Sequence, residues 1–200
     1  MRVAIIGAGN IGGTLARRLA GAGHSITLGV RDPSAADVSE LTKEGSIRAV
    51  SPADAVGDAE AVVLAVPGNA VADIVRGLGG SLSGKVVVDA TNSVGGASAN
   101  ARDVIAAAVP GARYVRAFNS LGWENIADPD YAGVTADAFY AANDSADGVA
   151  RELIGAVGLN PVRVGGPAEA DVVDGVLRLW FALAFTQKRG RGLAFKVLTR

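Results

Sequence analysis

The sequence contains no cysteine and a single histidine among its 200 residues. The lack of cysteine excludes disulfides, thiolate nucleophiles, iron–sulfur clusters and cysteine-bound zinc. One histidine cannot form a histidine-rich metal site, so we expect no metal centre. The formal net charge is only −1. Such a charge offers no bulk attraction for nucleic acid, and we expect no nucleic-acid partner.

The sequence also lacks a run of about 18 apolar residues, the length that a membrane-spanning helix needs. We therefore expect no membrane partner. Hydrophobic residues make up 50% of the chain and charged residues 20%, a balance typical of a compact folded domain. The chain enters an apolar segment directly after Met1 and shows no secretory pattern, so we expect a cytoplasmic protein.

Short apolar segments rich in β-branched residues alternate with segments of helical apolar spacing. We expect strands at residues 3–6, 25–30, 47–50, 61–66, 85–89, 113–118, 137–142 and 160–164. We expect helices at residues 10–22, 70–78, 99–109, 145–157, 168–185 and 193–198, and a short one that Ser51 and Pro52 begin. This order predicts an α/β fold: a Rossmann-type, doubly wound and mostly parallel sheet with helices on both faces, followed by a short C-terminal helical segment.

A glycine-rich turn, Gly7-Ala8-Gly9-Asn10-Ile11-Gly12, joins the first expected strand to the first expected helix. In this context the G-x-G-x-x-G pattern is typical of a dinucleotide site. The first glycine permits the tight turn, the second lets the backbone approach a pyrophosphate, and the third lets helix and strand pack closely. The helix N-terminus adds free N–H groups for the phosphates. A glycine turn without a ligand is the alternative, but the agreement of strand, loop and helix favours the site.

The residues after the second expected strand select the nucleotide. An NAD site usually has a carboxylate there, which binds the ribose 2′-hydroxyl. Here Val30 takes that position and Arg31 follows, and a guanidinium matches a 2′-phosphate in charge and shape. This alignment favours NADP. An alternative alignment places Asp32 on the ribose and favours NAD.

Three further loops follow expected strands with small or amide side chains: residues 66–69, 90–93 and 117–120. Ligands of such sheets bind beyond the carboxyl ends of the strands. Amides and hydroxyls there can hold a carboxamide and a ribose without adding charge. Turn chemistry alone explains any one of these loops, but three together favour a site.

Few residues are suited to acid–base catalysis. His24 lies in the turn that enters the second expected strand, at the end away from the site. None of the tyrosines is followed four residues later by lysine, so the Tyr-x-x-x-Lys pair of short-chain ketone reductases is absent. Asp89 and Glu124 remain possible acids. We assign no catalytic residue, because hydride transfer between two bound redox rings needs orientation and no protein base.

These features favour an NADPH-dependent reductase whose acceptor is itself a redox ring. Two alternatives remain open. One is the reduction of a small imine or carbonyl, with Asp89 or Glu124 as the acid. The other is a protein that senses NADPH by binding it without turnover.

Several segments resemble the NADPH-dependent coenzyme F420 reductase (F420:NADP oxidoreductase) family, in its bacterial dinucleotide-binding branch. They are residues 2–12, residues 29–33, residues 117–125, and residues 189–196 near the C-terminus. The resemblance implies NADP as cofactor and a deazaflavin, coenzyme F420, or a flavin as acceptor. It also implies a homodimer built with the C-terminal helices.

The resemblance implies a role for each part of the site. Residues 8–11 would surround the pyrophosphate, Val30 and Arg31 the 2′-phosphate, and Val66, Asn92 and Asn119 the nicotinamide half. The candidate cofactor-binding residues are Gly7, Ala8, Gly9, Asn10, Ile11, Gly12, Val30, Arg31, Val66, Pro67, Asn92 and Asn119.

A change in composition at Gly165-Gly166-Pro167 predicts a boundary. We expect an NADP-binding Rossmann domain over residues 1–165 and a C-terminal helical segment for dimerisation or substrate contact over residues 166–200. The second segment is too short for a core of its own, so it must pack on the sheet domain or on a second subunit.

Overall fold

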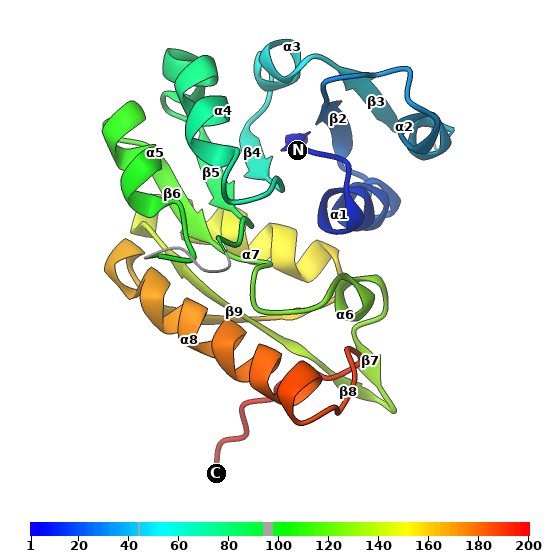
Figure 1. Cartoon of the computed structure of the whole chain (residues 1–200), viewed down its shortest axis with the longest axis vertical. Coiled ribbons are helices and arrows are strands. Elements are labelled where there is room, and N and C mark those ends of the chain that lie inside the picture. The colour runs from blue at the N-terminus through cyan, green and yellow to red at the C-terminus, as the bar shows by residue number, and fades with distance from the viewer. Residues whose placement is uncertain (44, 94–97) are drawn as a thin grey trace.

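The computed structural model describes residues 1–43, 45–93 and 98–200 and shows one large sheet with helices on both faces (Figure 1). The eight strands of the sheet have the order β10-β9-β6-β5-β4-β1-β2-β3. Their bounds are β1 Arg2–Ile6, β2 Ser25–Gly29, β3 Ile47–Val50, β4 Ala61–Leu64, β5 Val86–Asp89, β6 Arg113–Arg116, β9 Asp137–Ala142 and β10 Asn160–Gly165. The strands pair in parallel except β6 with β9, which pair antiparallel. The predicted fold class is therefore confirmed.

The helices cover the two faces of the sheet because alternate strand residues point to opposite sides. Their bounds are α1 Asn10–Gly21, α2 Ala36–Thr42, α3 Pro52–Val56, α4 Val71–Leu78, α5 Arg102–Ala108, α6 Trp123–Ala127, α7 Asp147–Ala156 and α8 Ala170–Phe181. Val3 and Ile5 pack in one core with side chains of α1, α2, α6 and α7. Ala4 and Ile6 pack in the other with side chains of α3, α4 and α5. Helix α8 lies along β9 (Figure 1).

Several predicted boundaries match the structure. Strands β3 and β9 have the predicted ends. Ser51 caps α3 as expected, since its side chain accepts a hydrogen bond from the Asp54 backbone N–H. Among the described residues, none of the helices combines the length and the hydropathy that crossing a membrane requires.

The predicted helix at residues 193–198 is wrong, because this segment has no regular secondary structure. The Leu193 carbonyl accepts hydrogen bonds from Asn125 Nδ2 at 3.0 Å and from Trp180 Nε1 at 2.9 Å, so these side chains satisfy it in place of a helix. The tail then runs beside β9, where the Asp137 backbone N–H donates to the Phe195 carbonyl at 3.0 Å.

Other predicted helices differ in their ends. Helix α8 stops at Phe181, and a π-helical turn over Ala182–Thr186 replaces its predicted last turn. A 3₁₀ turn at Asp144–Ala146 precedes α7 and takes the place of its predicted start. Helix α6 and the small hairpin of β7 Asp130–Tyr131 and β8 Val134–Thr135 were not expected, since their segments carry no clear period.

Candidate functional site

The glycine loop lies between β1 and α1, and two of its glycines are required by close backbone contacts. Gly7 has φ +103°, and a β-carbon there would lie 2.5 Å from the Ala65 carbonyl oxygen. A β-carbon on Gly12 would lie 2.0 Å from the Gly7 carbonyl oxygen. The start of α1 therefore lies so close to the end of β1 that neither position has room for a side chain.

The outer side of this loop is open. Gly9 is exposed, and no described atom lies within 4 Å of a β-carbon built on it. Within the described chain, no side chain caps α1 and no acidic residue occupies its first turn. The first N–H groups of the helix therefore remain available to an anion, beside the exposed Asn10 and the half-buried Ala8 and Ile11. The loop fits a pyrophosphate.

Val30 and Arg31 directly follow β2 and lie, like the glycine loop, at the carboxyl ends of the strands. Val30 is buried, and its N–H donates to the Val50 carbonyl at 3.0 Å. Arg31 is exposed and makes no contact to a charged partner among the described residues. Asp32 instead closes the turn, accepting from the Ser34 N–H at 2.9 Å and the Ser34 hydroxyl at 2.6 Å. These hydrogen bonds lower the pKa of Asp32. Asp32 is therefore engaged within its own turn, whereas Arg31 is exposed at this edge.

The loops after β4, β5 and β6 form one continuous edge with the glycine loop. Val66 borders Gly7, since its Cγ1 lies 3.1 Å from a β-carbon built there. Pro67 forms a parallel bridge with Asn92. Asn92 Nδ2 in turn donates to the Asn119 carbonyl oxygen at 3.0 Å. The structure thus brings these predicted residues together at the carboxyl ends of neighbouring strands.

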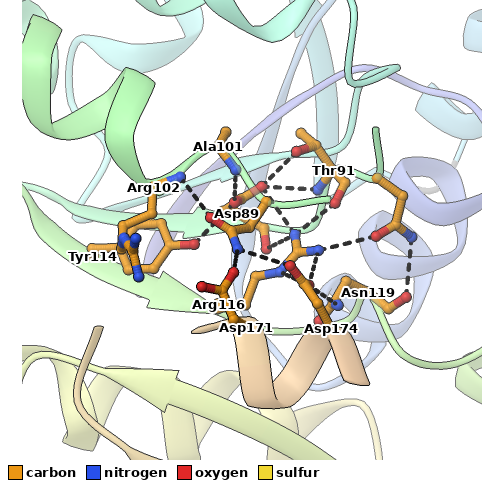
Figure 2. A network of polar contacts seen from close by, with 11 residues as sticks. Asp89, Thr91, Ala101, Arg102, Tyr114, Arg116, Asn119, Asp171 and Asp174 are labelled. Atoms are coloured by element: carbon orange, nitrogen blue, oxygen red, sulfur yellow. Dashed lines mark hydrogen bonds and ion pairs between the residues drawn. The ribbon is translucent and has the colours of Figure 1, made fainter. Parts of the chain in front are cut away.

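A buried ion-pair network contacts the side chains of Asn92 and Asn119, and Figure 2 shows the network. Arg116 on β6 has a fully buried side chain, as do Asp89 on β5 and Asp174 on α8. Arg116 Nη1 lies 3.2 Å from Asp89 Oδ1, and Arg116 Nη2 lies 2.6 Å from Asp174 Oδ1. The guanidinium also donates to the Thr91 carbonyl at 2.5 Å and to Asn92 Oδ1 at 3.0 Å.

The two acids considered from the sequence are both engaged. Asp89 accepts from the Thr91 and Ala101 backbone N–H groups and from the Tyr114 hydroxyl. Burial, with the Asp89 charge beside it, raises the pKa of Tyr114, which therefore stays protonated as a donor.

Glu124 is bound by Arg191 through two contacts of 2.5 and 3.1 Å. Burial raises the pKa of Glu124, but the hydrogen bonds from Arg191 outweigh it and the net direction is down. Glu124 is therefore a charged ion-pair partner at neutral pH.

His24 lies at the amino end of β2, as expected, on the opposite edge from these loops. It is buried with Nδ1 3.2 Å from the amino terminus, and burial lowers its pKa. Among the described residues, no group of three or more histidines or acids is placed to hold a metal ion.

Sequence reasoning missed Arg116 and Asp174. The signal was present, because Arg116 is a charged residue within the strand predicted at residues 113–118, and Asp174 lies with Val173 and Leu177 on the buried side of α8. A charge on a buried face requires a partner of opposite charge, and these two residues are each other's partners.

The sequence model of the family described as NADP oxidoreductase, coenzyme F420-dependent, matches residues 2–93. No curated protein matches the chain. A protein from Arthrobacter sp. FB24, described as a candidate F420-dependent NADP reductase, has a similar structure with a TM-score of 0.85 and 24% identity, covering 98% of this chain and 99% of that one.

Two other solved structures extend the comparison. The hypothetical protein SMa0349 from Sinorhizobium meliloti is 30% identical, with a TM-score of 0.73, over 100% of this chain and 96% of its own. An imine reductase from Streptomyces aurantiacus is 20% identical with a TM-score of 0.71, and the match covers 94% of this chain but 64% of the imine reductase.

The matched residues 2–93 contain the glycine loop, Val30, Arg31, Val66, Pro67 and Asn92. The expected family is confirmed. With this match and a relative 30% identical over 100% of this chain, the chain belongs to the family of coenzyme F420-dependent NADP oxidoreductases and is an NADP-dependent oxidoreductase.

Proposed function

We propose that this oxidoreductase transfers hydride between NADP(H) and a deazaflavin or flavin ring, with coenzyme F420 as the leading acceptor. One observation carries the proposal: the two acids considered as proton donors, Asp89 and Glu124, are both held in ion pairs with arginine. Neither is poised to protonate a substrate. A redox ring needs no such donor, because it can exchange its proton with solvent.

The chain's own residues would bind and orient the dinucleotide. Residues 7–12, with the N-terminus of α1, would hold the pyrophosphate, and Val30 with Arg31 would hold the adenosine 2′-phosphate. The nicotinamide half would lie along Val66, Pro67, Asn92 and Asn119. The open surface at Gly9 and the exposed guanidinium of Arg31 support this placement. When bound, the reduced nicotinamide supplies the hydride.

The alternative of imine or carbonyl reduction requires a proton donor, and Glu124 is the more accessible of the two acids, with a side chain 31% exposed. It predicts that Glu124→Gln abolishes turnover of a cyclic imine. Our proposal predicts that the same variant keeps the rate with a redox-ring acceptor, because Glu124 then serves only to bind Arg191.

The test is NADPH oxidation with a panel of coenzyme F420, FMN, FAD, riboflavin and a cyclic imine. We expect turnover with at least one of the four rings and none with the imine. Turnover with the imine alone would favour the alternative. Tight NADPH binding without oxidation by any acceptor would favour a sensor and overturn the proposal.

We also propose that the protein is a homodimer and that residues 166–200 form the dimerisation segment. Val172, Leu179 and Phe185 in this segment are 56%, 50% and 47% exposed, although all three are apolar. Covering such side chains is a common reason for association. The division into a Rossmann domain over residues 1–165 and a C-terminal segment over residues 166–200 also stays a prediction.

A further inference from the structure

We infer that Arg116 and Asp174 are positioning residues that fix the side-chain amide of Asn119. Arg116 holds the Asp174 carboxylate, and Asp174 accepts a hydrogen bond from the Asn119 amide nitrogen. The amide oxygen, Oδ1, is left to accept a hydrogen bond from the carboxamide N–H group of the nicotinamide ring. The inference rests on the NADP site proposed above and names the group that reads the reactive end of the dinucleotide.

The direction of the Asn119 amide follows from the chemistry of its neighbour. Asn119 Nδ2 lies 3.1 Å from Asp174 Oδ1. A carboxylate can only accept, so the amide must present its nitrogen there and its oxygen elsewhere. A flipped amide would place two acceptors against each other.

The direction of the Asn92 side-chain amide follows in the same way from its neighbour Arg116. Arg116 Nη2 lies 3.0 Å from Asn92 Oδ1, and a guanidinium can only donate. Asn92 must therefore turn its nitrogen away, and it donates to the Asn119 carbonyl oxygen at 3.0 Å. Asn92 thus holds the backbone of Asn119 while Asp174 holds its side chain.

Asp174 is itself held on both oxygens. Oδ1 accepts from Arg116 Nε at 2.9 Å and from Arg116 Nη2 at 2.6 Å, and Oδ2 accepts from Asn100 Nδ2 at 2.7 Å. Figure 2 shows Arg116 between the two acids, with α8 bringing Asp174 to the sheet. Because Oδ1 contacts both Arg116 and Asn119, the carboxylate cannot rotate away from Asn119 without breaking its ion pair with Arg116 inside the protein.

Two observations point to a ligand at Asn119. Its Oδ1 has no hydrogen-bond partner among the described residues, although Asn119 is only 1% exposed. Buried acceptors are nearly always satisfied, so this one calls for a donor that the chain does not supply. The preceding residue, Phe118, is buried with φ +61°, a left-handed conformation that a bulky residue rarely adopts. Strain of this kind gathers at binding sites.

The donor that fits is a primary carboxamide. Asn119 closes the line of residues that begins at the glycine loop and passes through Val66, Pro67 and Asn92, where the nicotinamide end of the dinucleotide is proposed. The nicotinamide carboxamide carries the N–H donor of that end. Because Oδ1 is covered in this structure, binding must displace the atoms above it.

The test compares the binding of NADP⁺ with that of its 3-acetylpyridine analogue, in which a methyl group replaces the amide nitrogen. Affinities are measured by calorimetry on the full chain. We expect wild-type protein to bind the analogue about fivefold more weakly, the factor that one net hydrogen bond typically gives. Asp174→Ala, which removes the acceptor of the Asn119 amide nitrogen and allows the amide to flip, should reduce this preference to about onefold.

Asp171→Ala is the matched control. Asp171 lies one turn earlier on α8 and, among the described residues, accepts a hydrogen bond from Asn100 alone, at 2.9 Å, so this variant should keep the fivefold preference. Asn119→Ala provides a second route if Asp174→Ala unfolds, and it should bind both nucleotides equally. Thermal denaturation of each variant shows that it is folded.

The outcomes separate the two proposals. If wild-type protein binds neither nucleotide, the NADP site fails and the inference fails with it. If it binds both equally well, the NADP site stands and the role of Asn119 is overturned. If folded Asp174→Ala keeps the preference of the wild type, the positioning role of Asp174 is overturned.

Discussion

Gly12→Ala is the sharpest test of how the glycine loop is built. The added β-carbon would lie 2.0 Å from the Gly7 carbonyl oxygen, 3.0 Å from its carbon and 3.3 Å from Ala65 Cβ. The β-carbon cannot rotate and the first two atoms are backbone, so α1 must shift away from β1. Overpacking of this kind costs about 1–3 kcal/mol. Alanine in a helix would recover up to about 1 kcal/mol.

Because the closest contact lies far inside van der Waals distance, we expect the steric cost to win, with a net loss of about 2 kcal/mol in the free energy of unfolding. Urea denaturation measures it. Gly13→Ala is the control in the same helix, since its β-carbon meets the Ala8 carbonyl oxygen at 3.4 Å and Leu41 at 3.5 Å, which are ordinary contacts. That variant should gain about 0.5–1 kcal/mol. Equal free energies of unfolding for the two variants would show that the Gly7 carbonyl does not exclude a side chain at residue 12.

Three further predictions concern the cofactor, the pH dependence and the assembly. Arg31→Ala should weaken NADPH about ten- to a hundredfold and NADH little, since it removes a charged phosphate contact; equal losses in calorimetry would contradict this. Burial and the nearby amino terminus lower the pKa of His24 below its usual 6.5. Between the folded and the unfolded pKa, the unfolded chain therefore binds more protons than the folded protein. The contribution of neutral His24 to stability is complete above the unfolded pKa and is lost as the pH falls through the folded pKa. His24→Gln should therefore reduce the difference in urea midpoint between about pH 7.5 and about pH 5.5, and an unchanged difference would count against a buried neutral His24. Leu179→Glu should convert the expected dimer to a monomer in light scattering, whereas a monomeric wild type would remove the homodimer proposal.

The fold was predictable from the sequence because its signals are local. The apolar runs predicted the strands of the sheet, and the glycine spacing predicted the loop and helix that follow β1. Helix α3 began where Ser51 and Pro52 predicted it. Each of these signals depends on residues within one or two turns of chain.

The missed features depend on contacts between distant segments. Residues 193–198 have helical spacing, yet the side chains of Asn125 and Trp180 donate to the Leu193 carbonyl and the segment is irregular. Arg116 and Asp174 are far apart in sequence, so their pairing could not be read from either segment alone. This pair also crosses the predicted boundary at residue 165 and joins the C-terminal segment to the edge of the sheet.

The central claim is that NADP binds along the carboxyl edge of the sheet, from the glycine loop to Asn119. The most direct measurement is a crystal structure of the protein with NADP⁺. We expect density for the pyrophosphate at the N-terminus of α1, for the 2′-phosphate at Arg31 and for the nicotinamide beside Asn119. Nucleotide bound anywhere else on the protein, or an empty glycine loop at saturating NADP⁺, would contradict it.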